Sequence, residues 1–497
     1  MKKIKVAFYS EVYESLAFER FMSILDNNGV ENRLFFNPCL FNDFYVNIPK
    51  LAEYFSSDID TFVAKIRDYA PDYLCITVYT DFLHQTMDFL KKIRKASPDI
   101  RIIAGGPHVT LEGKRFLQEN PIIDLGVRGA GEMAMNDIFS DRAFSDIDGL
   151  IFRKAHKVIE NNWYVLPHRK FADISEKKSP YYKAMPYRKD YLITTTGFGC
   201  YFSCSFCYHS AMRNMGKKYG VVKKSVDFMK KELIEFKKSG VKKIMFFDEE
   251  FLSDREFSIR FLNMYKKHIR IPFMCISHPL YISNEIAFLL KDAGCVNVEL
   301  GTQVMDEYIR KTHLNRHEKN KDIIKAFSAL RRAGLSVTIN HMFGLPEETE
   351  DIHRRSLEIY TRYNIKRMLF FYLTAYPSIS INRTLLEKKM IDADKLENVR
   401  RGTVDNMHLE GSTSRNRIFN RMEIFGEWIP FLPERFALYL LKKRFYRFIP
   451  ISSFLSYSAH ILSTFLFSPE YSIELHMKRY FYFIGKFFLK KIKGNTR

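Results

Sequence analysis

The sequence predicts an α/β protein in three parts, and three observations support this. Apolar runs alternate with amphipathic segments over residues 1–145 and 186–385, the pattern of parallel sheets covered by helices. Six strand–helix units follow residue 190, which predicts a partial (β/α)6 barrel rather than a complete eight-stranded one. The last stretch, 386–497, loses this rhythm, is rich in Phe, Tyr, Lys and Arg, and is expected to be mainly helical.

The first part predicts a doubly wound parallel sheet. Strands are expected at 5–10, 72–80 and 100–110, and helices at 18–29 and 82–99, with a strand, a turn and a helix start over 124–139. Residues 146–185 are polar and contain prolines, which indicates a small hairpin followed by a linker. In the second part the expected strands are 191–197, 242–251, 272–277, 297–302, 336–346 and 366–377.

Composition limits the class of protein. A chain of 497 residues is long enough for roughly three domains, and its 46% hydrophobic content excludes wholesale disorder. The start, MKKIKVAFYSEVYE, predicts a first strand rather than a signal peptide, because its apolar run is short and soon followed by acids. The net charge of +21 favours a phosphate-bearing partner or a solvated basic surface.

Cysteine usage indicates a reducing, cytoplasmic location. The seven cysteines form no disulfide pattern. Four of them, Cys39, Cys75, Cys275 and Cys295, are scattered and are expected to be buried and reduced.

The other three cysteines lie together in TTGFGCYFSCSFCYHS, residues 195–210. Cys200, Cys204 and Cys207 have the spacing C-x3-C-x2-C, and thiolates so arranged bind soft metals. A four-cysteine zinc site is excluded because no second C-x2-C pair exists, while a Cys3His zinc site with His209 stays open. On a 4Fe–4S cluster, three cysteines would leave one iron without a protein ligand, and that iron could accept an outside group.

The surroundings of the cysteines suit such a cluster. Gly197 and Gly199 allow the loop to curl tightly. Phe206 would place an apolar face beside the free iron. The loop follows the first strand of the barrel segment, and in parallel barrels the chemistry lies at the C-terminal ends of the strands.

On these residues the sequence resembles the radical S-adenosylmethionine (SAM) superfamily. The loop C-Y-F-S-C-S-F-C is similar to its cysteine signature, and the six units are similar to its TIM-like partial barrel, so the resemblance covers 186–385. It implies that SAM binds the free iron and is cleaved to methionine and a 5′-deoxyadenosyl radical, which takes hydrogen from a substrate. It also implies an electron donor such as ferredoxin or flavodoxin.

The resemblance implies SAM-binding positions at three strand ends, and it assigns no catalytic residue. In KKIMFFDEEF, Asp248 and Glu249 stand where the family meets the SAM amino group, although its common Gly-Gly-Glu is absent and a helix N-cap is the alternative. Gln303 stands where relatives carry Glu near the ribose, with Glu299 earlier on the same strand. Gly344, in HMFGLPEET, lies in a turn similar to GLPGET and would shape the loop around adenine.

Residues 1–145 resemble the cobalamin-binding domain of several radical SAM relatives, which has a Rossmann-like or flavodoxin-like fold. The segments ESLAFERFMSILDNNG, IIAGGPHVT and GVRGAGE are the ones that resemble it. Glycines at strand ends would let the backbone approach the corrin and its nucleotide tail. These glycines are Gly105, Gly106, Gly129 and Gly131, and Thr77 is a candidate hydroxyl toward the tail.

The cobalt ligand is not assigned. The DxHxxG loop that supplies a histidine in many cobalamin proteins is absent, because the first turn reads SEVYES. His84 and His108 are the nearby histidines, and neither is chosen. A degenerate domain that binds nothing is the alternative.

The C-terminal region is basic and aromatic. After Arg435 there are eleven Lys or Arg and two acidic residues, and rings interleave with charges in KKRFYRF and KRYFYFIGKFFLKKIK. Three interpretations stay open: a surface for an anionic membrane or a lipid-like substrate, a helical cap over the barrel, and nucleic-acid binding. The 21 residues from FIPISS to FLFS reach the length of a membrane span but are too polar to favour one.

These features predict a cobalamin-dependent radical SAM enzyme with a small-molecule or lipid-like substrate, in the cytoplasm or at the inner face of the membrane. Methylation of an unactivated carbon is the first expectation. Oxidative cyclisation or rearrangement, as in the anaerobic cyclase branch, is the second. A metal-containing RNA-binding protein is the alternative from another class, but no recognisable RNA-binding module supports it.

Overall fold

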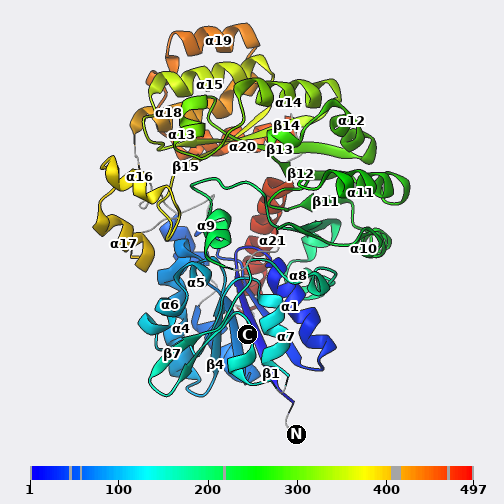
Figure 1. Ribbon diagram of the computed structural model, residues 1–497, viewed down its shortest axis with the longest axis vertical. Helices are drawn as coiled ribbons and strands as arrows, with labels where there is room; N and C mark the ends of the chain where they lie inside the picture. Colours follow the sequence, from blue (N-terminus) through cyan, green and yellow to red (C-terminus); the bar gives the residue numbers. More distant parts are fainter. Residues whose placement is uncertain are drawn as a thin grey trace.

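The computed structural model describes residues 3–494 except 44–47, 56–58, 141, 217–219, 404–412, 414, 415 and 467–470. These residues form two α/β domains and a helical C-terminal region, which confirms the predicted fold class (Figure 1). In Figure 1 the N-terminal domain lies below and the barrel above.

A seven-stranded sheet of order β2-β1-β3-β4-β5-β6-β7 forms the N-terminal domain. Its strands are β1 (Lys5–Glu11), β2 (Glu31–Asn37), β3 (Tyr73–Thr77), β4 (Arg101–Gly105), β5 (Leu125–Val127), β6 (Leu150–Lys154) and β7 (Lys157–Glu160). The first five pair in parallel, and the β6–β7 hairpin is added antiparallel. The predicted hairpin therefore extends this sheet, because Leu150 and Ile151 are fully buried and complete its core beyond the short β5.

Helices cover both faces of this sheet, with one apolar core on each face. They are α1 (Leu16–Asn27), α2 (Pro49–Phe55), α3 (Ile59–Tyr69), α4 (Leu83–Ala96), α5 (Pro107–Glu112), α6 (Lys114–Glu119) and α7 (Gly131–Ile138). Strand β2 was not expected from the sequence. It is an edge strand with only its last three residues buried, so it lacks the continuous apolar run of a central strand.

The barrel has the six predicted strands, all parallel, in the order β15-β14-β13-β12-β11-β8. They are β8 (Tyr191–Thr194), β11 (Lys243–Phe246), β12 (Phe273–Ser277), β13 (Cys295–Gln303), β14 (Ser336–Phe343) and β15 (Arg367–Tyr372). Helices α10 (Val226–Lys238), α11 (Arg255–His268), α12 (Asn284–Ala293), α13 (Glu307–Thr312), α14 (Asn320–Arg332) and α15 (Glu350–Arg362) connect them. Because β8 and β15 do not pair, the barrel is open on one side.

The C-terminal region adds helices to both domains. They are α16 (Asn382–Glu387), α17 (Ala393–Arg401), α18 (Arg417–Trp428), α19 (Glu434–Lys442), α20 (Ser453–Leu466) and α21 (Tyr471–Gly494). Helix α21, red in Figure 1, runs between the barrel and the N-terminal domain. Leu475 packs against Tyr191, Met245 and Met274 of the barrel strands, and Phe483 contacts Phe36 of β2. This part of the tail caps the open barrel. In the described part of the chain, no helix combines the length and the apolarity that crossing a bilayer requires.

A buried ion cluster joins the two domains at Lys178, which lies just before α8 (Ser179–Ala184). Its Nζ donates to a carboxylate oxygen of Glu19 in α1 and to the carbonyl oxygen of Ile193 in β8, and lies 3.3 Å from Glu176. All three charged side chains are at most 3% exposed. Burial opposes the charge on Lys178, but Glu19, Glu14 and Glu176 raise its pKa above the ordinary value.

The Lys178→Ala substitution is expected to lower the free energy of unfolding by about 3–5 kcal/mol, because it leaves buried carboxylates without their cation. The neighbouring Lys177→Ala is the control. It removes a more exposed pair with Asp26 and should cost less than about 1 kcal/mol. Urea unfolding followed by circular dichroism measures both, and equal losses would show that the cluster does not hold the domains together.

Candidate active site

The cysteine loop lies at the C-terminal end of β8. After it, β9 (Gly197–Phe198) pairs antiparallel with β10 (Val222–Lys223), and Cys207 caps α9 (Tyr208–Met215). A Cβ on Gly197 would lie 2.6 Å from the carbonyl oxygen of Val222. Gly199 has a φ of +90°, and a Cβ there would lie 2.8 Å from Leu166 Cδ1. Only glycine fits both positions, so the tight loop expected from the sequence is present.

Bonds to several elements fix this loop. The Ser205 amide donates to the carbonyl of Leu314 at 3.0 Å, and the Ile381 amide donates to the carbonyl of Ser205 at 3.1 Å. Arg213 Nη1 donates to the carbonyl of Cys200 at 2.7 Å. Phe206 packs against the apolar cluster beside the loop, which includes Met212 and Leu345. The loop is thus held before any cofactor binds.

The three thiols suit an iron–sulfur cluster as a donor set. Cys204 is buried, Cys200 and Cys207 are half-buried, and all three are free. Burial raises the pKa of each thiol, that of Cys200 to about 12. Such thiols become thiolates when a bound metal compensates their charge. Within the described residues, no three His, Cys, Asp or Glu side chains gather closely enough to hold a single metal ion.

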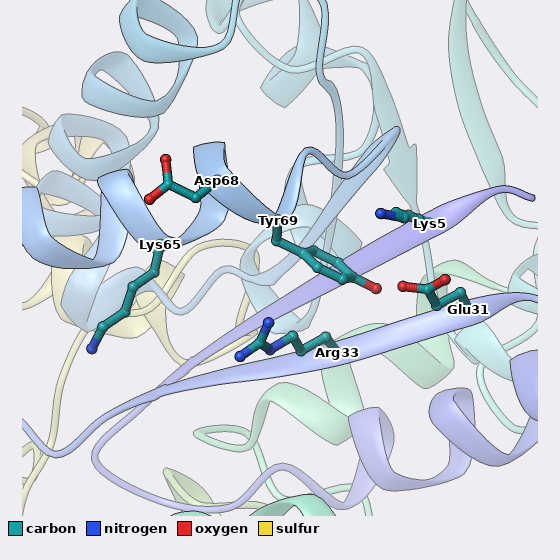
Figure 2. A pocket seen from close by; sticks show the side chains of 6 residues that line it. All are labelled: Lys5, Glu31, Arg33, Lys65, Asp68 and Tyr69. Atoms are coloured by element: carbon teal, nitrogen blue, oxygen red, sulfur yellow. The ribbon is translucent and has the colours of Figure 1, made fainter.

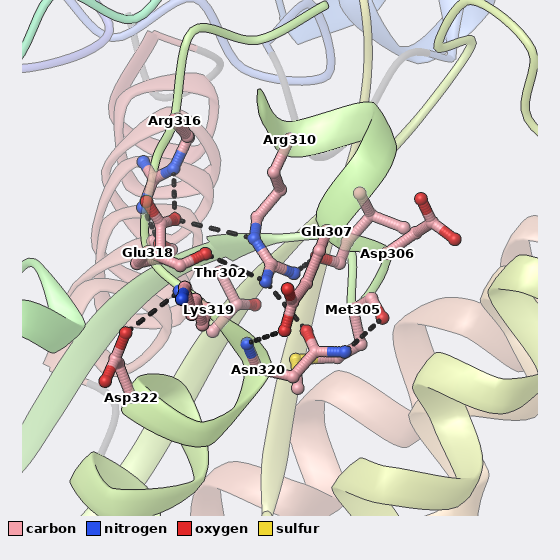
Figure 3. Close-up of polar contacts among 12 residues, drawn as sticks. Thr302, Met305, Asp306, Glu307, Arg310, Arg316, Glu318, Lys319, Asn320 and Asp322 are labelled. Atoms are coloured by element: carbon pink, nitrogen blue, oxygen red, sulfur yellow. Dashed lines mark hydrogen bonds and ion pairs between the residues drawn. The ribbon is translucent and has the colours of Figure 1, made fainter. Parts of the chain in front are cut away.

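Arg316 places a positive charge beside this donor set, and the sequence did not reveal it. Its Nη1 lies 3.8 Å from Cys204 Sγ, and its Nη2 donates to the carbonyl of Gly301 at 2.6 Å. Nε donates to Glu318 at 2.7 Å. Figure 3 shows Glu318 between the guanidinium groups of Arg316 and Arg310. This network holds the Arg316 guanidinium in place next to the cysteine loop.

The buried carboxylate of Glu318 stays charged in this network. Burial alone would raise its pKa, but a hydrogen bond with His278 and the charge of Arg316 bring the pKa down to about 2. The ring of His278 in turn stacks on Phe202 of the cysteine loop, with centroids 3.8 Å apart. Nothing in the sequence singled out Arg316 and Glu318, because R-H-E at 316–318 is an ordinary charged stretch.

The acidic segment after β11 has two different roles. Asp248 is buried and accepts bonds from the amide and the hydroxyl of Thr196, at 2.9–3.0 and 2.6 Å. Asp248 therefore fastens the segment after β8 to β11, and its contact with SAM stays a prediction. Glu249 accepts from the Gly199 amide at 3.0 Å and lies 3.5 Å from His209 Nε2. Its side chain is 26% exposed, so it reaches open space beside the cysteine loop.

Glu250 is a residue that sequence reasoning missed. It is buried and accepts from Ser277 Oγ and the His278 amide, both at 2.6 Å, so it links β11 to β12. Burial raises its pKa to about 7. Its role in the structure is to fix neighbouring strand ends.

Strand β13 is irregular where Gln303 ends it. Its register with β14 shifts between Gly301 and Gln303, and Gln303 has a φ of +61°. A bulge and a left-handed residue re-aim side chains and cluster at functional sites. Glu299, earlier on the strand, accepts from Asn340 Nδ2 at 2.9 Å. The contact of Gln303 and Glu299 with SAM stays a prediction.

The turn after β14 is braced by Glu348. Its oxygens accept from the amides of Gly344 and Leu345, both at 2.9 Å, and lie 2.9 Å from His353 Nε2. Gly344 has a φ of +80°, and a Cβ there would lie 2.3 Å from Thr413 Oγ1. Glu347 has a φ of +60°, which explains why glycine suits this position in related turns. The series of hydrogen bonds continues from His353 to His341, whose Nε2 lies 2.9 Å from His353 Nδ1.

The four glycines of the N-terminal sheet are explained mainly by protein neighbours. A Cβ would lie 2.7 Å from Thr77 Cγ2 at Gly106, 2.1 Å from the Tyr164 carbonyl at Gly129 and 2.6 Å from Phe21 Cζ at Gly131. At Gly105 a Cβ would meet only ordinary contacts. Protein packing by itself requires glycine at three of these positions, and the contact of the four glycines with cobalamin stays a prediction. Thr77 itself is half-buried at the end of β3.

The nearby histidines have local partners. His84 Nδ1 lies 3.0 Å from Asp88, and His108 Nδ1 lies 3.0 Å from Thr80 Oγ1. Burial lowers the pKa of His108 to about 4.

The C-terminal edges of the two sheets face each other. Tyr376, after β15, donates to Asp81 at 3.1 Å, and α5 packs on α9 through Leu111 and Met212. Tyr79 and Tyr208, one from each edge, are 46% and 37% exposed, yet burial raises the pKa of both. The two rings lie on the facing edges of the two domains.

A cavity borders each of the two sheets. One of about 500 Å³ is open and lined by Lys5, Glu31, Arg33, Lys65, Asp68 and Tyr69 (Figure 2). It lies at the N-terminal ends of β1 and β2, the edge opposite to the cysteine loop, so it is not part of the candidate site. A second, of about 410 Å³, lies inside the open barrel.

Comparison with protein families gives the same two domains. The profile of the Radical SAM superfamily matches residues 194–358, and that of the B12 binding domain matches residues 46–139. The chain is a radical SAM enzyme with a B12-binding domain. Its cofactors are a 4Fe–4S cluster, SAM and cobalamin.

Individual relatives are distant. The chain is 25% identical over 328 residues to an uncharacterized methyltransferase of Pyrococcus horikoshii, which covers 63% of this chain and 70% of that one. It is 23% identical over 359 residues to an anaerobic magnesium-protoporphyrin IX monomethyl ester cyclase of Rubrivivax gelatinosus, covering 67% and 61%. The solved structure of the cobalamin-dependent SAM radical enzyme OxsB with aqua-cobalamin bound has a TM-score of 0.67 at 13% identity, covering 93% and 75%.

The Glu348→Gln substitution is expected to weaken SAM binding about tenfold, because it replaces one of the two charged acceptors that brace the Gly344 turn. Glu347→Gln changes the exposed neighbour, which contacts Lys388 and His313, and should leave the affinity within about twofold. Anaerobic calorimetry on the reconstituted protein measures both. Unchanged affinity in Glu348→Gln would separate this turn from the SAM site.

Proposed function

We propose that this radical SAM enzyme is a cobalamin-dependent methyltransferase that adds a methyl group to an unactivated carbon of an apolar or lipid-like substrate. The observation that carries the proposal is that the end of the barrel that bears the cysteine loop faces the C-terminal edge of the B12-binding sheet, with Tyr376 bonded to Asp81 across the two. When bound, the cluster with SAM would supply radical chemistry between these two edges, and cobalamin would supply a methyl group.

The residues of the chain position and enclose the reactants in this proposal. Arg316 keeps a cation beside Cys204, Glu249 faces open space next to the loop, and Glu348 fixes the turn at Gly344. The Tyr79 and Tyr208 rings, one from each facing edge, would limit the entry of water once the cofactors are bound, which protects a radical from side reactions.

Cyclisation without methyl transfer is the second candidate. It is favoured by two proteins that are similar to this chain, one from Rubrivivax gelatinosus and one from Cereibacter sphaeroides. Both are named as anaerobic magnesium-protoporphyrin IX monomethyl ester cyclases. The same radical would start either reaction, and the fate of the methyl group of SAM distinguishes them.

Product stoichiometry tests the proposal. After anaerobic reconstitution with cobalamin and reduction with methyl-labelled SAM and candidate apolar substrates, methyl transfer should give 5′-deoxyadenosine and S-adenosylhomocysteine in equal amounts, with label in the product. One SAM is then used for hydrogen abstraction and another for remethylating cobalamin. 5′-Deoxyadenosine without S-adenosylhomocysteine would favour the cyclase. The Cys204→Ser variant should form neither, whereas Cys39→Ser, at a half-buried site in the N-terminal domain, should form both.

An exposed apolar and basic surface in the C-terminal region favours a lipid-like substrate. Phe448, Phe454 and Leu466, in and around the short helix η8 (Phe445–Phe448) and α20, are 79%, 78% and 64% exposed. Lys443 and Arg447 lie in the same segment, and basic residues beside exposed rings suit an anionic bilayer. We propose that this surface contacts such a bilayer.

Sedimentation with vesicles measures this contact. The protein should sediment with phosphatidylglycerol vesicles but not with phosphatidylcholine vesicles, and the double substitution Phe448→Ser with Phe454→Ser should reduce the bound fraction by about tenfold. Phe288→Ser, which removes a ring 50% exposed on α12, is the matched control. Equal binding by both variants would contradict the proposal.

A further inference from the structure

The cavity of about 410 Å³ lies inside the open barrel, and apolar side chains form most of its wall. Barrel strands contribute Ile193, Met245, Ile276 and Leu369, and Phe247 follows directly after β11. From the N-terminal domain come Val12, just after β1, and Leu16, the first residue of α1. The volume is typical of pockets for small molecules of drug size. Because the wall combines both domains, the cavity exists only when they are docked.

Helix α21 completes the wall where the barrel is open. It contributes Leu475, His476 and Arg479. Lys478 Nζ donates to the hydroxyl of Tyr191 at 2.7 Å, which ties the helix to β8. Arg479 forms an ion pair with Asp43, and both side chains are at most 3% exposed. The helix is therefore bonded to both domains and forms a fixed wall rather than a loose tail.

The charges around the cavity are balanced. The lining contains three arginines, Arg188, Arg367 and Arg479. It also contains the carboxylates of Glu14 and Glu299, and a third carboxylate, that of Asp43, pairs with Arg479. Burial lowers the pKa of His476 to about 4, so its ring is neutral at neutral pH. A charged ligand would leave a buried charge without compensation, at a cost that an uncharged ligand avoids.

One pair of polar side chains in the lining has unused hydrogen-bonding capacity. Glu14 and Arg188 lie 3.1 Å apart, with side chains 3% and 5% exposed. Glu14 Oε1 pairs with Arg188 Nη2 in this contact and lies 3.8 Å from Lys178 Nζ, but among the described residues neither oxygen of Glu14 accepts a hydrogen bond and Nε and Nη2 of Arg188 donate none. Buried polar atoms are normally satisfied, so this pair is suited to bind a polar group of a ligand.

We propose that this cavity is the substrate pocket, that it takes an uncharged and largely apolar molecule, and that Glu14 and Arg188 bind the polar group of that molecule. The assignment as substrate pocket rests on the proposed function. The C-terminal helix is then part of substrate recognition, with Leu475 as the contact that limits the size of the ligand.

Two fluorescent probes that differ by one charge test the pocket. N-Phenyl-1-naphthylamine is uncharged, and 8-anilinonaphthalene-1-sulfonate is the same skeleton with a sulfonate. The full-length protein should bind the uncharged probe more tightly than the sulfonate. Leu475→Trp and Leu369→Trp, which fill the cavity from α21 and from β15, should each weaken binding of the uncharged probe at least about tenfold.

Leu489→Trp is the matched control, because Leu489 lies on the same helix and is 61% exposed. It should bind the uncharged probe like the unaltered protein. Leu369 is half-buried on an edge strand, so its variant carries the test if Leu475→Trp does not fold. Unchanged binding in the folded cavity variants, or tighter binding of the sulfonate, would overturn the proposal.

The titrations need no reductant, so they are independent of the chemistry. If no SAM is cleaved while the probes behave as expected, the proposed function fails and the neutral pocket stands. If SAM is cleaved and methyl is transferred while the cavity variants bind the probe normally, the enzyme stands and the pocket assignment fails.

Discussion

Three thiols in one short loop can hold a cluster only if the backbone of that loop is fixed from several sides. In this chain, packing requires glycine at Gly197 and Gly199, and Glu249 accepts from the Gly199 amide. Arg316 adds a cation next to Cys204, held by Glu318. Burial raises the pKa of all three thiols, so a compensating charge is needed when they ionise, and the fixed loop is what places them for it.

The same constraint extends to the contact between the domains. A space for two cofactors exists only if the C-terminal edges of both sheets stay opposed, and buried charges join the domains in addition to the apolar packing of α5 on α9. Lys178 links α1 to β8, and Arg479 with Asp43 links α21 to the N-terminal domain. Buried ion pairs contribute little net stability, but they penalise any arrangement in which one partner is left alone. They thereby specify one relative orientation of the domains.

Much of the fold could be predicted because regular strands carry a regular signal. The six barrel strands are buried apolar runs separated by amphipathic helices, and all six are present. Strand β2 was missed because only its last three residues are buried, and the place of the β6–β7 hairpin depends on pairing that no local pattern encodes. At the site, the cysteines were readable from their spacing. Arg316, Glu250 and the role of Asp248 were not, because their partners come from distant segments.

The C-terminal region shows why composition alone could not separate its interpretations. Rings and lysines alternate throughout it, and that composition suits a cap, a membrane surface or a nucleic-acid groove equally well. The three-dimensional arrangement separates the C-terminal region into a buried part and an exposed part. Leu475 and Arg479 of α21 turn toward buried partners, whereas Phe448 and Phe454 remain exposed. One segment therefore both lines the barrel cavity and presents an exposed apolar and basic surface, and under the proposed function the first would hold the substrate that the second draws from a membrane.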